Sequence, residues 1–227
     1  METYTTRLLS KKYLTKHILE LRLEKPQNFE FHAGQFIQVK APIGDTHIYR
    51  SYSISSTPSD EYLELCVKLY DTGVASQLFR MIEPGSELTF KGPAGRFTVE
   101  ETDSDLYFVA TGVGLAPIMG MIEDELSNKK NTQKIHLIFG VRYDTDIFWN
   151  DRLKALEKNH SNFTYSVTVS QPHDEWTGLR GRVTEHIPED TSTIHAYLCG
   201  SMDMIKSVRD MLGQRGTDMR TVHFEIF

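Results

Sequence analysis

The sequence predicts two domains, an antiparallel β-barrel followed by an α/β domain with a doubly wound parallel sheet. In the first hundred of the 227 residues, short alternating or β-branched segments are separated by Pro, Gly and Asp clusters. After about residue 100, strand-like segments alternate with helical patterns, which is typical of βαβ units. We therefore divide the chain into residues 1–99 and 100–227, with the boundary within 98–104.

The first domain is expected to contain five strands and one helix. Its strand segments alternate polar and apolar residues or carry β-branched and aromatic ones. The helix begins near Gly73, and its apolar face is formed by Leu78, Phe79 and Ile82. The strands are expected at 17–24, 35–40, 49–55, 62–69 and 86–91, and the helix at 75–82.

The second domain is expected to begin with a buried strand that leads into a glycine-rich turn and a helix. The alternation of strands and helices then continues to the last residue. The strands are expected at 106–111, 134–140, 163–169, 195–200 and 221–227, and the helices at 115–127, 146–158 and 202–212.

The composition is that of an ordinary globular protein, with 39% hydrophobic and 25% charged residues. A net charge of -6 argues against general binding to nucleic acid or to anionic membranes. The longest apolar run, 106–122, contains three glycines and a proline, so we interpret it as strand, loop and helix and not as a membrane span. Because the first residues lack an apolar signal segment, we expect a cytoplasmic protein.

The two cysteines, Cys66 and Cys199, are far apart and lie in strand-like segments. They cannot form a zinc site or supply the four thiolates of an iron–sulfur cluster, and no metal is expected. Any redox chemistry must therefore use another cofactor.

The segment RSYSISS, residues 50–56, combines a cation, an aromatic ring and several hydroxyls on one extended stretch. Alternation places Arg50 and Tyr52 on one face, and Ser51 and Ser53 on the other. This combination suits a flat, anionic ligand better than a hydrophobic core. The alternative is an edge tyrosine with a solvated arginine beside it.

Two glycine-containing segments have the character of phosphate-binding turns. In ATGVGLAP, residues 110–117, Gly112 and Gly114 allow backbone N–H groups to approach an anion, and Pro117 fits the first helical turn. Because the pattern is GxGxxP and not GxGxxG, a loop without ligand is an equal alternative. The segment GVAS, 73–76, opens the helix of the barrel and offers N–H groups and a hydroxyl to a phosphate.

The chain resembles the ferredoxin–NADP reductase family of flavoproteins over nearly its whole length. The resemblance implies that the barrel holds FAD and that the α/β domain holds NADH or NADPH. It rests on the order and spacing of AGQF (33–36), RSYSISS (50–56), GVAS (73–76), GPAGRF (92–97), TGVGLAP (111–117), GVR (140–142), WTGLRGRV (176–183), YLCGSMDMI (197–205) and the closing FEIF.

The resemblance also implies roles for individual residues near the flavin. Arg50 matches the ligand of the flavin pyrophosphate, Tyr52 the tyrosine that stacks on the isoalloxazine, and Ser53 the serine near flavin N5. Further cofactor contacts are implied for Ser51, Lys68, Gly73, Val74, Ala75, Ser76, Thr111, Gly112, Gly114 and Pro117.

Three residues near the end of the chain match catalytic positions of the family. Cys199 would lie close to the nicotinamide ring, although a small buried hydrophobic residue on a strand is the common alternative. Glu225 matches an acidic residue near the chain end. Phe227 matches an aromatic residue that stacks on the second flavin face, and it would have to move before nicotinamide could reach the flavin.

The choice between NADH and NADPH stays open. Arg142 and either Arg180 or Arg182 fit positions that read the 2'-phosphate of NADPH in relatives, although solvated surface charge explains them equally well. Gln171 occupies a place where some NADPH-using relatives have an arginine, so one bidentate phosphate contact is missing.

The resemblance implies an enzyme that passes a hydride from NAD(P)H to bound FAD and then single electrons to a separate protein, such as ferredoxin or flavodoxin, or to an oxygenase system. One alternative is an NAD(P)H:flavin reductase that uses diffusible flavin, although Tyr52 and Phe227 favour a retained one. A non-catalytic redox or nucleotide sensor and a cytochrome-reducing enzyme are weaker alternatives.

Overall fold

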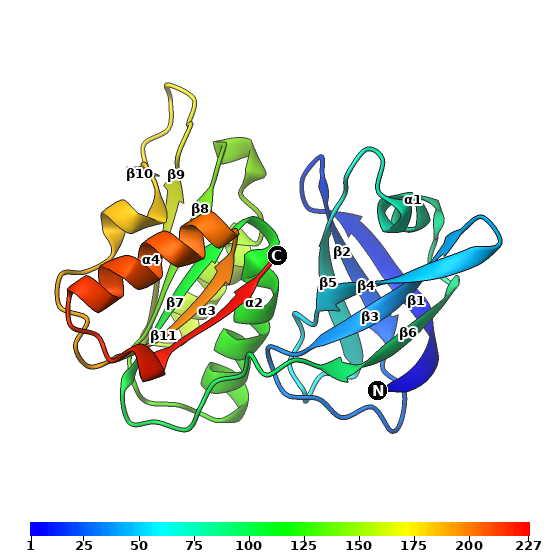
Figure 1. Ribbon diagram of the computed structural model, residues 1–227, viewed down its shortest axis with the longest axis horizontal. Coiled ribbons are helices and arrows are strands. Elements are labelled where there is room, and N and C mark those ends of the chain that lie inside the picture. Colours follow the sequence, from blue (N-terminus) through cyan, green and yellow to red (C-terminus); the bar gives the residue numbers. More distant parts are fainter.

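The computed structural model describes residues 1–227 and confirms the predicted fold class, with one six-stranded sheet in each of two lobes (Figure 1). In the first lobe all neighbouring strands are antiparallel, in the order β4-β3-β6-β1-β2-β5. A bridge between Ile54 and Leu65 joins the two edges of the curled sheet. Its elements are β1 (Glu2–Tyr13), β2 (Ile18–Glu24), β3 (Phe36–Ile43), β4 (Thr46–Ser53), β5 (Tyr62–Lys68), α1 (Val74–Met81) and β6 (Glu87–Ala94).

Strand β1 was not predicted, although it is the longest strand of the barrel and pairs with both β2 and β6. Only Thr6 and Leu8 are buried along its 12 residues, so the apolar alternation that identifies a half-buried strand is absent. A register shift between Leu8 and Ser10 interrupts the periodicity further. Pairing with its neighbours, and not its own pattern, therefore makes this segment a strand.

The second lobe contains a sheet in the order β10-β9-β8-β7-β11-β12, and all of its pairs are parallel. None of the helices combines the length and the apolar character needed to cross a bilayer. The lobe consists of β7 (Asp105–Thr111), α2 (Leu115–Glu123), β8 (Ile135–Val141), α3 (Asn150–Asn159), β9 (Phe163–Val169), β10 (Leu179–Arg180), β11 (Ile194–Gly200), α4 (Met202–Gln214) and β12 (Val222–Ile226).

Two predicted helices differ from those observed. The helix expected at 115–127 changes at Asp124 from α to a π turn that ends at Asn128. The helix expected to begin at residue 146 begins at Asn150, because Trp149 has a left-handed backbone with φ of 56°. The predicted domain boundary falls in the segment between β6 and β7 and stays a prediction.

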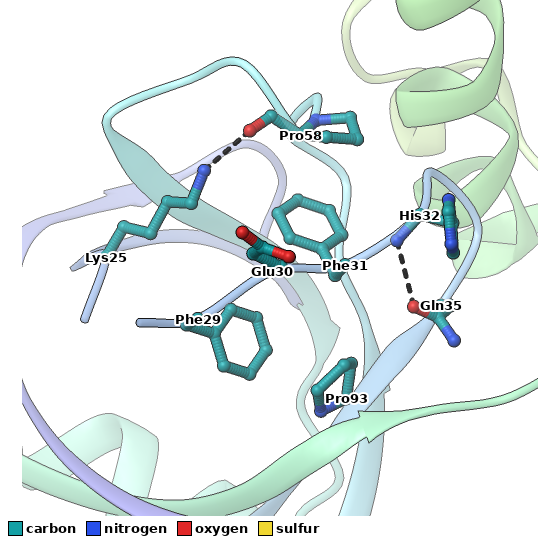
Figure 2. A pocket seen from close by; sticks show the side chains of 8 residues that line it. All are labelled: Lys25, Phe29, Glu30, Phe31, His32, Gln35, Pro58 and Pro93. Carbon is teal, nitrogen blue, oxygen red and sulfur yellow. Dashed lines mark hydrogen bonds between the residues drawn. The ribbon is translucent and has the colours of Figure 1, made fainter. Parts of the chain in front are cut away.

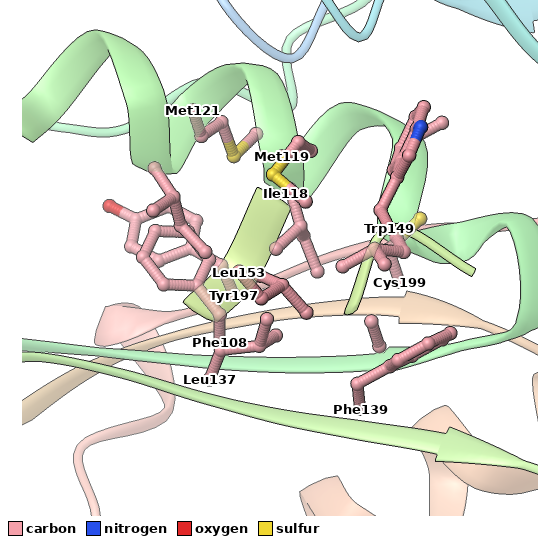
Figure 3. Packing of buried hydrophobic residues seen from close by; sticks show 14 of the residues in the cluster. Phe108, Ile118, Met119, Met121, Leu137, Phe139, Trp149, Leu153, Tyr197 and Cys199 are labelled. Atoms are coloured by element: carbon pink, nitrogen blue, oxygen red, sulfur yellow. The ribbon is translucent and has the colours of Figure 1, made fainter. Parts of the chain in front are cut away.

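Each lobe has a buried hydrophobic cluster of its own, and a third cluster extends across both lobes. The buried cluster between α2 and the parallel sheet (Figure 3) also includes Ile18, Ala33, Cys66 and Phe97 from outside the second lobe's elements. Helix α2 approaches so closely that a Cβ on Gly120 would lie 3.0 Å from the backbone oxygen of Ser56. A larger residue at that position would push the helix away from the barrel.

A buried ion-pair network also joins the lobes. The Glu64 side chain on β5 is fully buried, and its carboxylate oxygens lie 3.0 Å from Nε of Arg22 and 2.6 Å from NH1 of Arg152. Arg152, on α3, also pairs with Glu123 of α2 at 2.5 Å. Since a buried carboxylate is costly without partners, this network requires the barrel and the α/β lobe to stay together.

We expect Arg152→Ala to lower the free energy of unfolding by about 3 kcal/mol, because Glu64 would keep only one cationic partner in a buried position. The measurement is urea unfolding of the two proteins at neutral pH.

The matched control is Lys154→Ala, on the same helix, because its ammonium group is exposed and lies 3.8 Å from Asp151. An exposed pair contributes less than about 1 kcal/mol. Equal losses in the two variants would show that the Glu64 network does not hold the lobes together.

Candidate functional site

The residues predicted to be catalytic gather where the two lobes face each other at the carboxyl ends of the parallel strands. The strand order reverses between β7 and β11, and ligands of open α/β sheets bind at this kind of switch point. Figure 1 shows the end of the chain, in red, between the two lobes.

The barrel contributes the end of β4. Arg50 and Ser51 are exposed there, while Tyr52 is half-buried, with its ring edge-on to Phe79 of α1 at 5.0 Å. Burial raises the pKa of Tyr52 to about 12, so its hydroxyl is neutral. A neutral aromatic ring and an exposed guanidinium therefore occur together, as the alternation predicted.

The strand expected at 49–55 ends two residues earlier, at Ser53. Ser55 and Ser56 are fully buried, and both hydroxyls bind Glu64: the first donates to its carboxylate at 3.1 Å, and the second accepts from its backbone N–H at 3.0 Å. These hydroxyls belong to the contact between the lobes and not to a ligand site.

Ser53 connects the barrel to the α/β lobe. It is buried, and its hydroxyl donates to Oε2 of Glu225 on β12 at 3.4 Å. Burial raises the pKa of Glu225 to about 7, and the hydrogen bond from Ser53 partly opposes that rise. A carboxyl group that exchanges its proton near neutral pH thus lies beside a serine from the other lobe.

Cys199 lies next to Glu225 in the parallel register of β11 and β12. It is fully buried, and burial, followed by the nearby Glu225 charge, raises the pKa of its thiol. Phe227 follows with its side chain 51% exposed, and its backbone N–H donates to the carbonyl of Gly200 at 3.1 Å. The structure therefore brings together all four residues predicted to be catalytic, Ser53, Cys199, Glu225 and Phe227.

The N-terminus of α1 fits an anionic group. Gly73 is its N-cap, and no side chain caps the first turn, so the backbone N–H groups of Val74, Ala75 and Ser76 have no side-chain partner. The buried Ser76 hydroxyl accepts from the backbone N–H of Tyr70 at 2.9 Å, which engages its oxygen within the protein.

Two further side chains lie beside α1. Lys68 is exposed at the end of β5, with its ammonium group 5.5 Å from the ring centre of Tyr70. Tyr70 is 59% exposed beside the N-terminus of α1, so it is a candidate site residue that the sequence did not predict. Its position directly before the turn that leads into α1 could have indicated it.

The glycine-rich turn after β7 is explained partly by packing. Gly112 has φ of +54° and open space around it, as an approach to a ligand requires. A Cβ on Gly114 would lie 2.2 Å from the backbone oxygen of Cys199, and Pro117 is buried in α2. Contact with β11 therefore accounts for Gly114 without a ligand, which was one of the two alternatives for this turn.

Thr111 marks the contact between the ends of β7 and β11. Its hydroxyl accepts from the backbone N–H of Ser201 at 3.4 Å, and a Cβ on Gly200 would lie 2.1 Å from the same oxygen. The Thr111 side chain thus fills the space between the two strand ends, and a side chain at position 200 would have no room there.

The three arginines that could contact the 2'-phosphate of NADPH differ in the hydrogen bonds that they already make within the protein. Arg142 is exposed and donates through Nε to Oε1 of Gln171 at 2.9 Å, which leaves its terminal nitrogens without a hydrogen-bond partner. Arg180 instead directs NH2 at three carbonyls of its own loop. Arg182 is exposed; its backbone N–H donates to the Glu185 carboxylate, and its backbone carbonyl accepts from the Glu185 N–H.

Two surface pockets lie elsewhere in the barrel. One, of about 550 Å³ (Figure 2), has polar groups that bind one another: Lys25 donates to the carbonyl of Pro58, and the backbone N–H of His32 donates to Gln35. Neither pocket is lined by a predicted site residue; the second is lined by Lys40, Pro42, Asp45, Thr46, His47, Leu78, Glu87, Leu88 and Thr89.

Two family models match the chain, one in each lobe. The model of the oxidoreductase FAD-binding domain matches residues 6–99, and that of the oxidoreductase NAD-binding domain matches residues 108–210. The lobes are therefore an FAD-binding and an NAD-binding domain. The uncapped helix, the half-buried tyrosine and the open glycine turn fit these cofactors.

The chain is 30% identical to ferredoxin–NADP reductase B of Sorangium cellulosum over 99% of its own length and 97% of that relative. It is 31% identical to the phenol hydroxylase P5 protein of Acinetobacter pittii, of which it covers 66%. Among solved structures, the ferredoxin NADP+ reductase of Neisseria gonorrhoeae, with bound FAD and NADP, matches with a TM-score of 0.88 at 23% identity, over 100% of this chain and 99% of that one.

The full-length match to a reductase, together with an FAD-binding and an NAD-binding domain in the expected order, shows that this chain belongs to the ferredoxin–NADP reductase family of flavoproteins.

Proposed function

We propose that this chain carries electrons from NAD(P)H through FAD to a separate protein, with its reaction centre at the Ser53–Glu225 contact. When bound, the flavin supplies the chemistry: it accepts a hydride and releases electrons one at a time. The observation that carries the proposal is the hydrogen bond from Ser53 of the FAD-binding domain to Glu225 of the NAD-binding domain. It puts a donor and a proton-exchanging group where the two cofactor domains meet.

The barrel would hold FAD through two kinds of contact. The exposed Arg50 and the uncapped first turn of α1 offer positive charge and N–H groups to the pyrophosphate. Tyr52, oriented by its edge contact with Phe79, offers a ring face for stacking.

The residues at the domain contact would act on the reacting end. With flavin bound, the Ser53 hydroxyl, which donates to Glu225 in this structure, would be the group of the barrel available to hydrogen-bond the reacting end of the ring. Because the pKa of Glu225 is about 7, its carboxyl can hold a proton on Oε2 and exchange it through the Ser53 hydroxyl. The neutral Cys199 thiol, which is fully buried beside Glu225, would keep water away from the nicotinamide side of this contact.

Arg142 would read the 2'-phosphate of NADPH. Its Nε is fixed by Gln171, so the guanidinium is oriented while both terminal nitrogens stay free for a phosphate. Gln171, which stands where some relatives have an arginine, thus positions the arginine that is present. Arg180, whose NH2 group is engaged by loop carbonyls, is not expected to take part.

The electron acceptor is proposed to be a ferredoxin, a flavodoxin or an oxygenase component. The names of the relatives support this range, since one is a ferredoxin–NADP reductase and another belongs to phenol hydroxylase. A cytoplasmic location remains a prediction from the sequence.

The purified protein is expected to be yellow and to lose its flavin absorbance when NADPH or NADH is added without oxygen. In Ser53→Ala we expect the flavin content to be unchanged and the reduction rate to fall about 100-fold, because one preorganised donor to the reacting atom is lost. Stopped-flow absorbance at the flavin band measures both.

The control for this variant is Ser10→Ala, an exposed serine on β1, which should reduce at the wild-type rate. A colourless protein that oxidises NAD(P)H only with added flavin would indicate the diffusible-flavin reductase instead. A flavin that neither nucleotide reduces would indicate a sensor.

We expect the free energy of unfolding of Glu225→Gln, measured relative to that of wild type, to increase as the pH rises from about 5 to about 8. The folded-state pKa of Glu225 is raised from 4.5 to about 7. The stability that wild type has with this carboxyl protonated is therefore complete below pH 4.5 and is lost as the pH rises through 7. Glutamine stays neutral throughout. The relative gain is on the order of 2 kcal/mol, measured by urea unfolding of flavin-free protein at a series of pH values.

Glu189→Gln, at an exposed position in the same domain, is the matched control and should show no such drift. A difference between Glu225→Gln and wild type that stays constant with pH would contradict the raised pKa.

Arg142→Ala is expected to lower kcat/KM for NADPH about tenfold while leaving that for NADH within about twofold, because only NADPH carries the phosphate that the guanidinium would meet. Steady-state rates with a dye acceptor measure the ratio. Arg220→Ala, an exposed arginine paired with Asp218, is the control. Equal losses with both nucleotides would overturn this role.

A further inference from the structure

Three potential metal ligands gather near the amino ends of β11 and β12. They are Glu100, from the segment between the two domains, His195 of β11 and His223 of β12. One ligand atom from each residue lies within 4.8 Å of the other two. The residues are far apart in the sequence, so no spacing pattern announced them, and no metal was expected.

Both histidines have a ring nitrogen that is buried without a partner. Nδ1 of His195 and Nε2 of His223 are inaccessible to solvent, and neither makes a hydrogen bond. Nε2 of His223 lies 3.7 Å from Oε2 of Glu100, which is too far for a hydrogen bond but suits two ligands of one ion. An unpartnered nitrogen of His223 thus lies beside a carboxylate, and the neighbouring His195 carries a second unpartnered nitrogen, which is a cost that a bound cation would remove.

The surrounding groups orient the three ligands. Nε2 of His195 is 3.3 Å from the hydroxyl of Thr102, so a proton held there leaves Nδ1 as a bare lone pair, as in many metal-bound histidines. The ring of Tyr197 stacks on His223 at 4.8 Å, and its hydroxyl accepts from the backbone N–H of Glu100 at 3.0 Å. One tyrosine thus positions two of the ligands.

We propose that Glu100, His195 and His223 bind a divalent zinc ion, with water in the remaining coordination position. Two nitrogens and one carboxylate oxygen are a ligand set that zinc accepts in tetrahedral sites. Ligands on opposite edges of such a site are about 3.3 Å apart, so the cluster must contract. The side chain of Glu100 is 61% exposed and free to close over the ion.

The site would fasten the interdomain segment to the edge of the parallel sheet. Glu100 belongs to the segment that joins β6 to β7, while His223 belongs to the edge strand that also carries Glu225. His223 and Glu225 are two residues apart on β12, a separation of about 7 Å. The ion would therefore lie near the Ser53–Glu225 contact, on the side of the amino end of β12. It would act as a structural anchor and not as an electron carrier, since zinc has no redox chemistry.

The test is calorimetric titration of zinc chloride into tag-free, chelator-treated, flavin-loaded protein at pH 7.5. We expect one ion per chain, and affinities at least about tenfold weaker in Glu100→Gln, His195→Asn and His223→Asn. His17→Asn, at an exposed histidine, should bind like wild type. Absence of binding, or equal affinity in wild type and all three ligand variants, would overturn the proposal.

A second measurement guards against variants that fold poorly. At one zinc concentration, zinc should raise the melting temperature of wild type and of His17→Asn, since a ligand of the folded state stabilises it, and should raise that of Glu100→Gln by less. Glu100→Gln changes an exposed side chain and is expected to keep its flavin and its fold. An equal rise in wild type and Glu100→Gln would show that zinc binds elsewhere.

Discussion

The contact between the two domains is the constraint on which the rest of the structure depends. Glu64 is fully buried, and its charge is satisfied only when Arg22 of the barrel and Arg152 of the α/β domain are both in place. The backbone of α2 reaches the barrel at Gly120, where no side chain intervenes. Charge pairing and close packing therefore fix the same relative position of the two sheets.

That fixed position creates the site. Ser53 and Glu225 are separated by 172 residues and belong to different sheets, yet they meet at 3.4 Å. A shift between the domains by the length of one bond would break this contact, and it would change the desolvation that raises the pKa of Glu225. The chemistry proposed for these residues thus depends on a distant ion pair and on one glycine.

Alternation and turn residues were enough to predict most strands and the order of the two domains, and the resemblance named the site residues one by one. Strand β1 was not predicted, because its residues are mostly polar and its pairing register with β2 shifts. For Gly114 the sequence left an anion contact and a loop without ligand as equal alternatives, because its close approach to Cys199 depends on the folded chain. The Glu64 network and the cluster of Glu100, His195 and His223 join distant segments, and only the folded chain brings such groups together.

The hydrophobic cluster that spans both domains also limits how freely their sequences can be recombined with those of relatives. Two family models divide the chain neatly, but Ile18, Ala33 and Cys66 pack into the same buried cluster as α2. A hybrid that joined this barrel to a relative's nucleotide domain would bring together two apolar faces shaped for other partners. A functional hybrid would therefore have to take α2 and the barrel surface that packs against it from the same parent protein.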